Sequence, residues 1–242
     1  MAAWSSAFGP ILEPLIRTKA WLAIQRARAE TVMNTNQPIR RTITREEIAE
    51  LPIRRYEGDV NLVATVADLT RAMDDIRGER VVGLDTETRP SFRRGESHLP
   101  CLIQVATARQ VHLFQLSRLD CSTAAAELLG SPTIVKAGIA LKYDLSRLKL
   151  VFPFDAVGVL DLGVVAKSHG LEQSGVRTLA GMFLHFRIPK GMGTSNWAAP
   201  RLSAQQIGYA ATDAWACREL YLHFQGLGML PSGDPSPPAR TG

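Results

Sequence analysis

The chain has 242 residues, of which 45% are hydrophobic, enough for the buried core of one domain or of two. Its formal net charge of +5 suits a polyanionic partner without requiring one. The three cysteines show no spacing typical of zinc sites, and no apolar run approaches the roughly 18 residues of a membrane span. We therefore expect a cytoplasmic protein with reduced thiols rather than a zinc, disulfide-linked, secreted or membrane protein.

The first 32 residues are mildly amphipathic, with basic side chains interleaved among apolar ones. This pattern fits a targeting segment, an interaction helix or an upstream extension, and Met33 offers an alternative start. We favour a non-catalytic extension over residues 1–54, partly helical or disordered, within which residues 42–52 form a short helix capped at Thr44. A tail over residues 229–242, rich in Pro, Gly and Ser, is predicted to be disordered.

Short apolar runs alternate with helical patterns between residues 55 and 228. Strands are expected at 60–63, 81–84, 102–106, 111–116, 133–137 and 157–160, and helices at 66–76, 124–129, 144–150, 162–167, 177–184 and 203–224. The turn at residues 108–110 is short enough to join two of these strands in a hairpin. A hairpin-forming group followed by strands alternating with helices predicts one α/β domain with a mixed β-sheet flanked by helices.

Asp85 and Glu87 follow the apolar run of residues 81–84. Because they are two residues apart on a strand, both side chains leave the same face. The pattern Asp-x-Glu is common, and in most sequences it marks a solvated strand end. Here the pair is set against the core, where carboxylates need partners.

Asp144 follows a buried strand and a glycine at a helix start, where it could cap the helix, face a pocket, or do both. Tyr209 and Asp213 are four residues apart in a strongly helical stretch, so they project from one face in successive turns. Alone, such a pair is more often packing plus a surface charge. Four carboxylates converging in one pocket would repel one another unless divalent cations lay between them. With a tyrosine alongside, they predict a hard-metal site for phosphodiester hydrolysis.

Segments 81–88, 136–144 and 209–213 together resemble the three exonuclease motifs of the DEDD superfamily, in the branch whose third motif carries a tyrosine. Residues 194–203, which contain Ser-Asn-Trp, resemble the lead-in to that motif in ribonuclease D and in the exonuclease domain of Werner-type helicases. The resemblance spans roughly residues 60–225. It implies a ribonuclease H-like fold and a 3'-5' exonuclease that uses two divalent cations, Mg²⁺ or Mn²⁺.

Carried over by position, the resemblance implies that Asp85, Glu87 and Asp213 hold the first ion. Asp85 would bridge to a second ion, which Asp144 supports, and Tyr209 would orient the attacking water. The partner would be RNA or DNA, shortened from a 3'-hydroxyl end to nucleoside 5'-monophosphates. The alternative is a catalytically silent nucleic-acid-binding or scaffold protein on the same fold. All five motif positions are filled, which weighs against that alternative.

Substrate contacts are expected beside the first two motifs. The candidates for holding the 3' end are Thr86, Thr88, Phe92, Leu141, Lys142 and Tyr143. Candidates for tracking phosphates are Arg89, Arg93, Arg94, Lys136 and Lys142, although each fits an ordinary solvated charge equally well. Ribonuclease D carries helical accessory domains after its nuclease core, whereas this chain stops soon after the third motif. A role in tRNA maturation is therefore doubtful, and the choice between RNA and DNA stays open.

Overall fold

A mixed β-sheet forms the centre of the protein, whose computed structural model describes residues 40–93 and 95–230. The strands are β1 (Asp59–Val63), β2 (Val81–Thr88), β3 (Pro100–Ala106), β4 (Gln110–Gln115), β5 (Val135–Gly138) and β6 (Val159–Asp161). Within the described residues they form one six-stranded sheet of order β1-β4-β3-β2-β5-β6. Only β3 runs antiparallel to its neighbours in this sheet, and its hairpin with β4 was predicted. The α/β class and the mixed sheet are confirmed.

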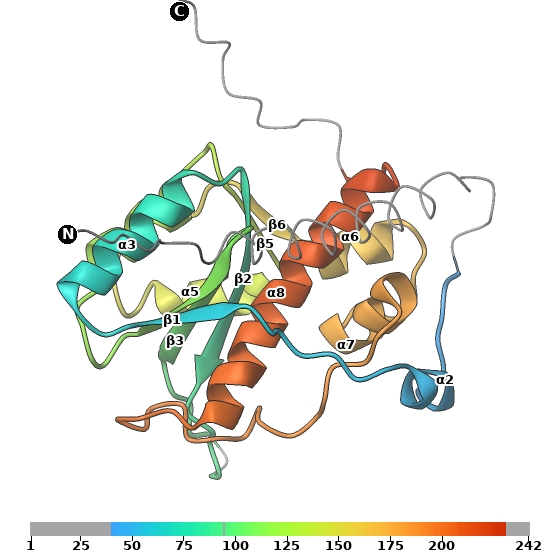
Figure 1. Ribbon diagram of the computed structural model, residues 1–242, viewed down its shortest axis with the longest axis horizontal. Coiled ribbons are helices and arrows are strands. Elements are labelled where there is room, and N and C mark those ends of the chain that lie inside the picture. Colours follow the sequence, from blue (N-terminus) through green and yellow to red (C-terminus); the bar gives the residue numbers. More distant parts are fainter. Residues whose placement is uncertain (1–39, 94, 231–242) are drawn as a thin grey trace, which may run out of the picture. The chain divides into compact units, whose positions relative to one another are not determined.

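Helices cover both faces of the sheet. They are α2 (Arg45–Glu50), α3 (Val66–Arg77), α4 (Ser122–Gly130), α5 (Leu141–Leu148), α6 (Leu162–Ser168), α7 (Val176–Leu179), the π-helical turn η1 (Ala180–Leu184) and α8 (Ala204–Gly226). Figure 1 shows α8 crossing the sheet, where its alanines pack on β3 and β4. Helices α3, α4 and α5 pack against the opposite face, whose core contains Ile76, Leu128 and Leu145. The central strand β2 therefore lies between two helical layers.

Residues 40–56 pack onto the sheet domain instead of forming a separate segment. Thr44 caps α2, accepting a hydrogen bond from the Glu47 amide at 3.1 Å, as the sequence predicts. The Tyr56 amide donates to Thr212 Oγ1 on α8 at 3.0 Å, and Ile53 bridges to Arg187. The predicted boundary at residue 55 is therefore not a break in packing. The predictions made for residues 1–39, for Arg94 and for residues 231–242 lie outside the described residues.

Three predicted elements differ from the observed ones. Strand β2 continues through Thr88 because β3 pairs with it from Gly83 onward, so Asp85 and Glu87 lie within the strand. Helix α5 begins at Leu141, which places Asp144 in its first turn and makes the N-cap interpretation of Asp144 wrong. The helix predicted over residues 177–184 is divided between α7 and the π-helical turn.

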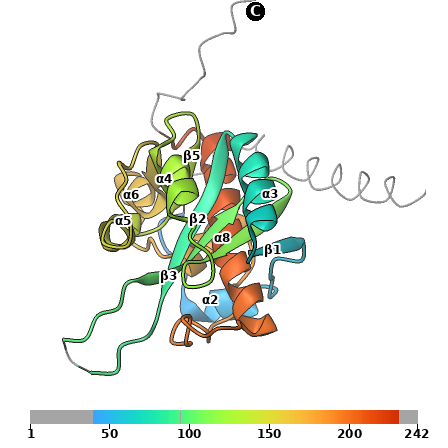
Figure 2. The ribbon, with the colours of Figure 1, turned by 90° about the vertical axis from the view of Figure 1, so that its left-hand side faces the viewer.

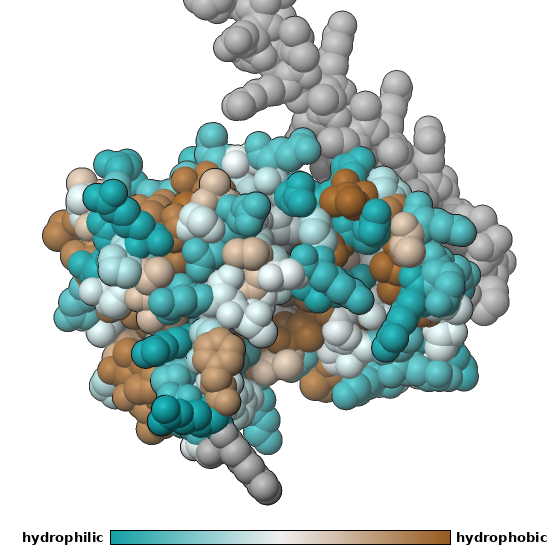
Figure 3. Space-filling view, turned by 90° about the horizontal axis from the view of Figure 1, so that it is seen from below, coloured by the Kyte–Doolittle hydropathy of each residue, from teal (hydrophilic) through white to brown (hydrophobic). Residues whose placement is uncertain are grey.

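In the described part of the chain, no helix combines the length and the apolar character needed to cross a bilayer. Seen from below the view of Figure 1, the surface is a mosaic of hydrophilic and hydrophobic residues (Figure 3). The segment between β2 and β3 projects away from the helices (Figure 2), and it begins directly after the first carboxylate pair.

Candidate active site

Three carboxylates from β2 and α8 meet on one side of the sheet. Asp85 and Glu87 alternate with Thr86 along β2, so both point toward the face that α8 covers. Asp213 lies buried on α8. One oxygen from each of these three side chains lies within 4.8 Å of the others. Residues 126 positions apart in the chain thus form one acidic cluster.

The close approach of α8 to β2 depends on a missing side chain. A Cβ atom on Gly83 would lie 1.9 Å from the carbonyl oxygen of Ala214 and 2.8 Å from the amide of Arg218. Only glycine therefore lets the helix backbone lie directly against the strand at this point. Asp85 follows Gly83 by two residues, and Asp213 precedes Ala214 by one. The contact at Gly83 thereby sets how near the two carboxylates come.

Burial raises the pKa of each carboxyl in this acidic cluster, and the charges of neighbouring acids add to the effect for Asp85 and Glu87. Burial raises the pKa of Glu87 to about 9, and the charges of Asp85, Asp213 and Asp144 add to the effect. For Asp85, burial and the Asp213 charge lift the pKa well above its usual range, although Asp85 Oδ1 accepts a hydrogen bond from the Thr86 amide at 2.9 Å. Burial raises the pKa of Asp213 to about 6. The cluster is therefore electrostatically unfavourable without a cation.

The donor set of this cluster fits a hard divalent cation. All three side chains offer carboxylate oxygens, the ligand type that Mg²⁺ and Mn²⁺ prefer. Asp213 Oδ1 is buried and has no hydrogen-bond partner among the described residues. A bound cation would supply the partner that this oxygen lacks.

Asp144 faces the same site from the first turn of α5 but lies outside the three-carboxylate cluster. Burial raises its pKa to about 6. Its charge in turn raises the pKa of Asp85 and of Glu87. The residue is thus electrostatically coupled to the cluster across a longer distance.

Tyr209 stands beside Asp213 on the same face of α8, as their spacing predicts. Burial raises the pKa of Asp213, and the nearby Tyr209 hydroxyl acts against this effect and lowers it. Burial and the Asp213 charge raise the pKa of Tyr209 further above its usual value near 10. The ring packs at 6.0 Å, centroid to centroid, from that of fully buried Trp197, which belongs to the Ser-Asn-Trp lead-in. Tyr209 is therefore a neutral phenol held in a fixed place.

Two polar residues at this site were missed by the sequence reading. Arg177, on α7, donates from Nη2 to the Tyr209 hydroxyl at 3.3 Å. Its sequence signal is a single charge in the otherwise uncharged stretch of residues 176–184. Gln104 lies opposite Asp85 in the β2–β3 register and is fully buried, with both amide atoms lacking a partner among the described residues. Its signal is a lone polar residue inside an apolar strand.

The predicted substrate contacts fall into exposed and buried groups. Phe92 and Tyr143 are 84% and 65% exposed, and Lys142 is exposed as well. Thr86 and Thr88 are half-buried on β2.

Burial contradicts two of the predicted nucleic-acid contacts, one apolar and one basic. Leu141 is 1% exposed and packs into the core, so it presents no surface for a nucleotide. Lys136 is fully buried, and its Nζ donates to the Ser131 carbonyl at 2.6 Å, which excludes it from tracking phosphates. Both side chains are buried because they lie on the interior sides of α5 and β5.

Comparison with known proteins places this site in a family. Residues 60–227 match the family model described as 3'-5' exonuclease. The chain belongs to the 3'-5' exonuclease family. All five predicted motif residues lie within the matched range.

Curated relatives of this exonuclease family include the human exonuclease mut-7 homolog, 30% identical over 201 residues, which cover 71% of this chain and 23% of the relative. Ribonuclease D of Gluconacetobacter diazotrophicus is 31% identical over 167 residues, covering 67% of this chain and 42% of that protein. The chain thus spans less than half the length of these relatives. Among solved structures, the Nibbler EXO domain of Aedes aegypti superposes with a TM-score of 0.65 at 21% identity, covering 75% of this chain and 95% of that one. This similarity supports the ribonuclease H-like α/β fold that the resemblance implied.

Proposed function

We propose that this protein is a metal-dependent 3'-5' exonuclease that shortens single-stranded or recessed 3' ends of RNA or DNA to nucleoside 5'-monophosphates. The observation that carries the proposal is the cluster of Asp85, Glu87 and Asp213, whose oxygens lie within 4.8 Å of one another in a chain of this family. Their raised pKa values are the expected property of carboxylates arranged around a site for cations. We assign this activity to residues 55–228.

The residues that would hold cations follow from their positions. Asp85, Glu87 and Asp213 would hold one Mg²⁺ or Mn²⁺ ion, and Asp85 together with Asp144 a second. The longer distance of Asp144 suits a contact through water. When bound, two such ions acidify water and neutralise charge on the phosphate.

Tyr209 would orient the attacking water by hydrogen bonding. Its raised pKa keeps the phenol protonated at neutral pH, so it donates or accepts a hydrogen bond and does not remove a proton as a phenolate. Replacing Tyr209 by Phe removes the hydroxyl and keeps the ring against Trp197. Such a variant should slow turnover strongly while its metal affinity stays close to that of the wild type.

Exposed aromatic and basic side chains near the carboxylates would bind the substrate. Tyr143 adjoins Asp144 on α5, and Phe92 lies on the segment that follows β2, where each offers a face for stacking on a base. Lys142, which is exposed, would meet a phosphate. Ribonuclease D of Trypanosoma brucei has been crystallised with the RNA U12. For the present chain we propose a nucleic acid 3' end as partner, with the preferred sugar to be measured.

The test is a paired digestion of single strands with a free or a blocked 3' end, as RNA and as DNA, in Mg²⁺, Mn²⁺ or EDTA. We expect a ladder from 5'-labelled strands with a free 3'-hydroxyl, lost in EDTA and in Asp85→Ala or Asp213→Ala. Asp74→Ala is the matched control, because the Asp74 side chain is 68% exposed and lies outside the site. A wild-type protein that gives no ladder on any strand would support the silent binding or scaffold alternative instead.

A further inference from the structure

The hydroxyl of Tyr209 is contacted by a cation from another helix. Arg177 Nη2 lies 3.3 Å from the Tyr209 oxygen, and the guanidinium carbon lies 5.9 Å from the ring centroid. Arg177 reaches this position from α7, whereas Tyr209 lies on α8. The contact thus joins two helices at the single oxygen atom to which we assign the orientation of water.

The direction of the hydrogen bond from Arg177 limits how the Tyr209 hydroxyl can be oriented. A guanidinium group can only donate, so the Tyr209 oxygen accepts from Arg177. The Tyr209 proton then remains free to be donated to Asp213, four residues further along the same face of α8. Arg177 therefore engages one lone pair of the Tyr209 oxygen, while Asp213 is available to accept the Tyr209 proton.

Arg177 lies near enough to Asp213 for its charge to lower the pKa of that carboxyl, but it makes few direct contacts besides Tyr209 among the described residues. It forms no ion pair within 4.0 Å of a carboxylate among the described residues, in contrast to Arg218 on α8, which pairs with Glu79 at 3.4 Å. The Nε of Arg177 is buried without a hydrogen-bond partner in the described part of the chain, as is that of Arg218, so the two arginines differ in the ion pair and not in this atom. The cation is thus half-buried against a phenol, where a purely structural arginine would be expected to find a carboxylate or carbonyl groups.

We propose that Arg177 is a positioning residue that holds the Tyr209 hydroxyl in its working orientation. The inference rests on the proposed function, in which the oxygens of Asp213 are engaged by a cation. Under those conditions Asp213 is a weaker acceptor for the phenol proton, which can turn toward water. The hydrogen bond from Arg177 then keeps the oxygen in place, together with the packing of Trp197 on the ring.

The first experiment needs no catalysis. The chain has four tyrosines, so protein labelled with 3-fluorotyrosine gives four fluorine signals, of which Tyr209→Phe identifies one. In Arg177→Met, the Tyr209 signal should shift or broaden while the signals of Tyr56, Tyr143 and Tyr221 stay. An unchanged Tyr209 signal would overturn the inference, and this result holds whether or not the protein proves to be a nuclease.

The second experiment is a double-mutant cycle on hydrolysis. Arg177→Met should lower kcat about tenfold at unchanged KM and at saturating Mn²⁺, part of the hundredfold that misplacing a reacting group can cost. In the Tyr209→Phe background the same substitution should have no further effect, because the oxygen on which Arg177 acts is gone. Arg177→Lys, which keeps a charge and a donor, should retain part of kcat and serves as the second variant if Arg177→Met does not fold.

Arg218→Met is the matched control, since it removes another partly buried arginine from an ion pair away from the site. It should lower stability and leave both the Tyr209 signal and kcat as they are. An equal loss of kcat from Arg177→Met in both backgrounds would overturn the inference, because Arg177 would then act independently of Tyr209. Unchanged kcat in Arg177→Met would overturn it as well.

Discussion

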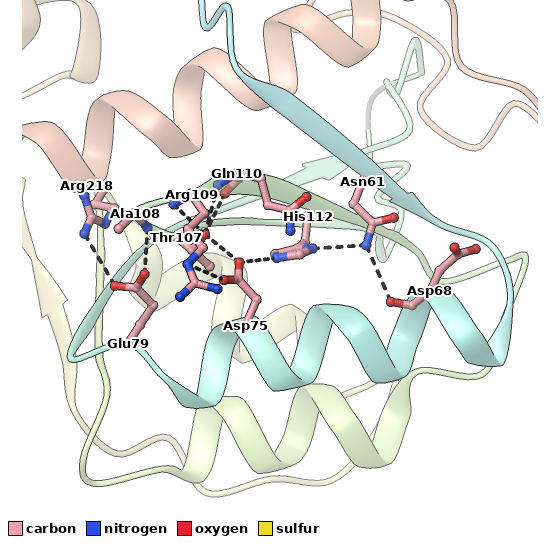
Figure 4. Close-up of polar contacts among 10 residues, drawn as sticks. All are labelled: Asn61, Asp68, Asp75, Glu79, Thr107, Ala108, Arg109, Gln110, His112 and Arg218. Atoms are coloured by element: carbon pink, nitrogen blue, oxygen red, sulfur yellow. Dashed lines mark hydrogen bonds and ion pairs between the residues drawn. The ribbon is translucent and has the colours of Figure 1, made fainter. Parts of the chain in front are cut away.

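Two groups of acidic side chains lie against the same sheet in opposite electrostatic surroundings. On one side, Asp75 of α3 accepts hydrogen bonds from Thr107 Oγ1 at 2.7 Å and from His112 Nε2 at 2.9 Å (Figure 4). Burial alone would raise the pKa of Asp75, but these bonds outweigh it and lower the pKa. On the other side, Asp85, Glu87 and Asp213 face one another, and the pKa of each is raised.

The comparison of Asp75 with the acidic cluster shows that burial of an acid does not by itself indicate a functional site. Asp75 has its partners within the chain, and His112 continues the network to Asn61 at 3.2 Å, which ties β1, β4 and α3 together. The carboxylates of the acidic cluster instead face one another, and Asp213 Oδ1 has no hydrogen-bond partner among the described residues. A buried acid with a complete set of partners stabilises the fold, whereas a buried group of acids without them is prepared for a ligand that the chain itself does not supply.

The largest expected effect comes from removing one charge from the acidic cluster. Asp85→Asn should lower kcat by more than about 10³-fold, since losing even one transition-state hydrogen bond can cost that much. The same variant should unfold at a higher temperature than wild type in EDTA, because it relieves repulsion and the burial of a charge. Digestion assays and thermal unfolding measure the two effects. A variant that is inactive but destabilised in EDTA would contradict this account of the site.

The opposite result is expected at the Asp75 network. Asp75→Ala should lower the free energy of unfolding by about 3 kcal/mol, because it leaves His112 and Thr107 buried without their partner. Urea unfolding at 25 °C measures this change, and kcat per folded molecule should match the wild type. A loss of kcat without a loss of stability would show that the two groups are not independent.

The pH dependence of stability should also differ in sign between the two groups. Glu87 has a pKa of about 9 in the folded protein, against about 4.3 in an unfolded chain. Between these values the folded state binds more protons than the unfolded state, so metal-free stability falls as pH rises. Urea midpoints at pH 5, 7 and 9 in EDTA test this, and Mg²⁺ should restore stability most at the highest pH. Glu87→Gln should flatten the curve.

The lowered pKa of Asp75 acts in the other direction. Its contribution to stability is present above the pKa of an unfolded Asp, about 3.9, and is lost as the pH falls through the lower folded value. Asp75→Asn should therefore weaken the loss of stability in acid while leaving the alkaline loss unchanged. If Asp75→Asn changed the loss of stability at alkaline pH, that loss would not be due to the acidic cluster alone.

The smallest expected effect concerns the turn that presents Asp144. Ala140 has a φ of 59°, in the left-handed region, and precedes α5 without a side-chain cap. Ala140→Gly should relieve strain of about 1 kcal/mol, partly offset by the greater freedom of glycine in the unfolded chain. We expect a gain in stability below about 1 kcal/mol by urea unfolding. Destabilisation would mean that the Ala140 methyl group contributes packing that outweighs its backbone strain.

The sequence predicted the sheet and the acidic residues because both depend on short local patterns. Apolar runs identified the strands, and spacings of two and four residues placed Asp85 with Glu87 and Tyr209 with Asp213 on common faces. It did not predict Arg177, because no local pattern indicates that α7 brings this residue to α8. The same limit explains Lys136, whose burial is decided by helices and strands far away in the chain.

The start of α5 was misplaced for a related reason. Ala140 adopts the left-handed conformation and is followed by α5, which begins three residues before Asp144, the residue interpreted as a possible cap. Nothing in the sequence indicates that an alanine adopts this conformation.

The narrow contact at Gly83 has a consequence for judging which related chains are active. An alanine there would push α8 from β2, since its Cβ would overlap the Ala214 carbonyl, and the two halves of the acidic cluster would separate. Such a chain would keep every acidic residue and the tyrosine, and a search for those five letters would count it as a working nuclease. An active chain therefore needs all five functional side chains, but their presence is not enough. Gly83, which has no side chain, also decides whether the carboxylates come together.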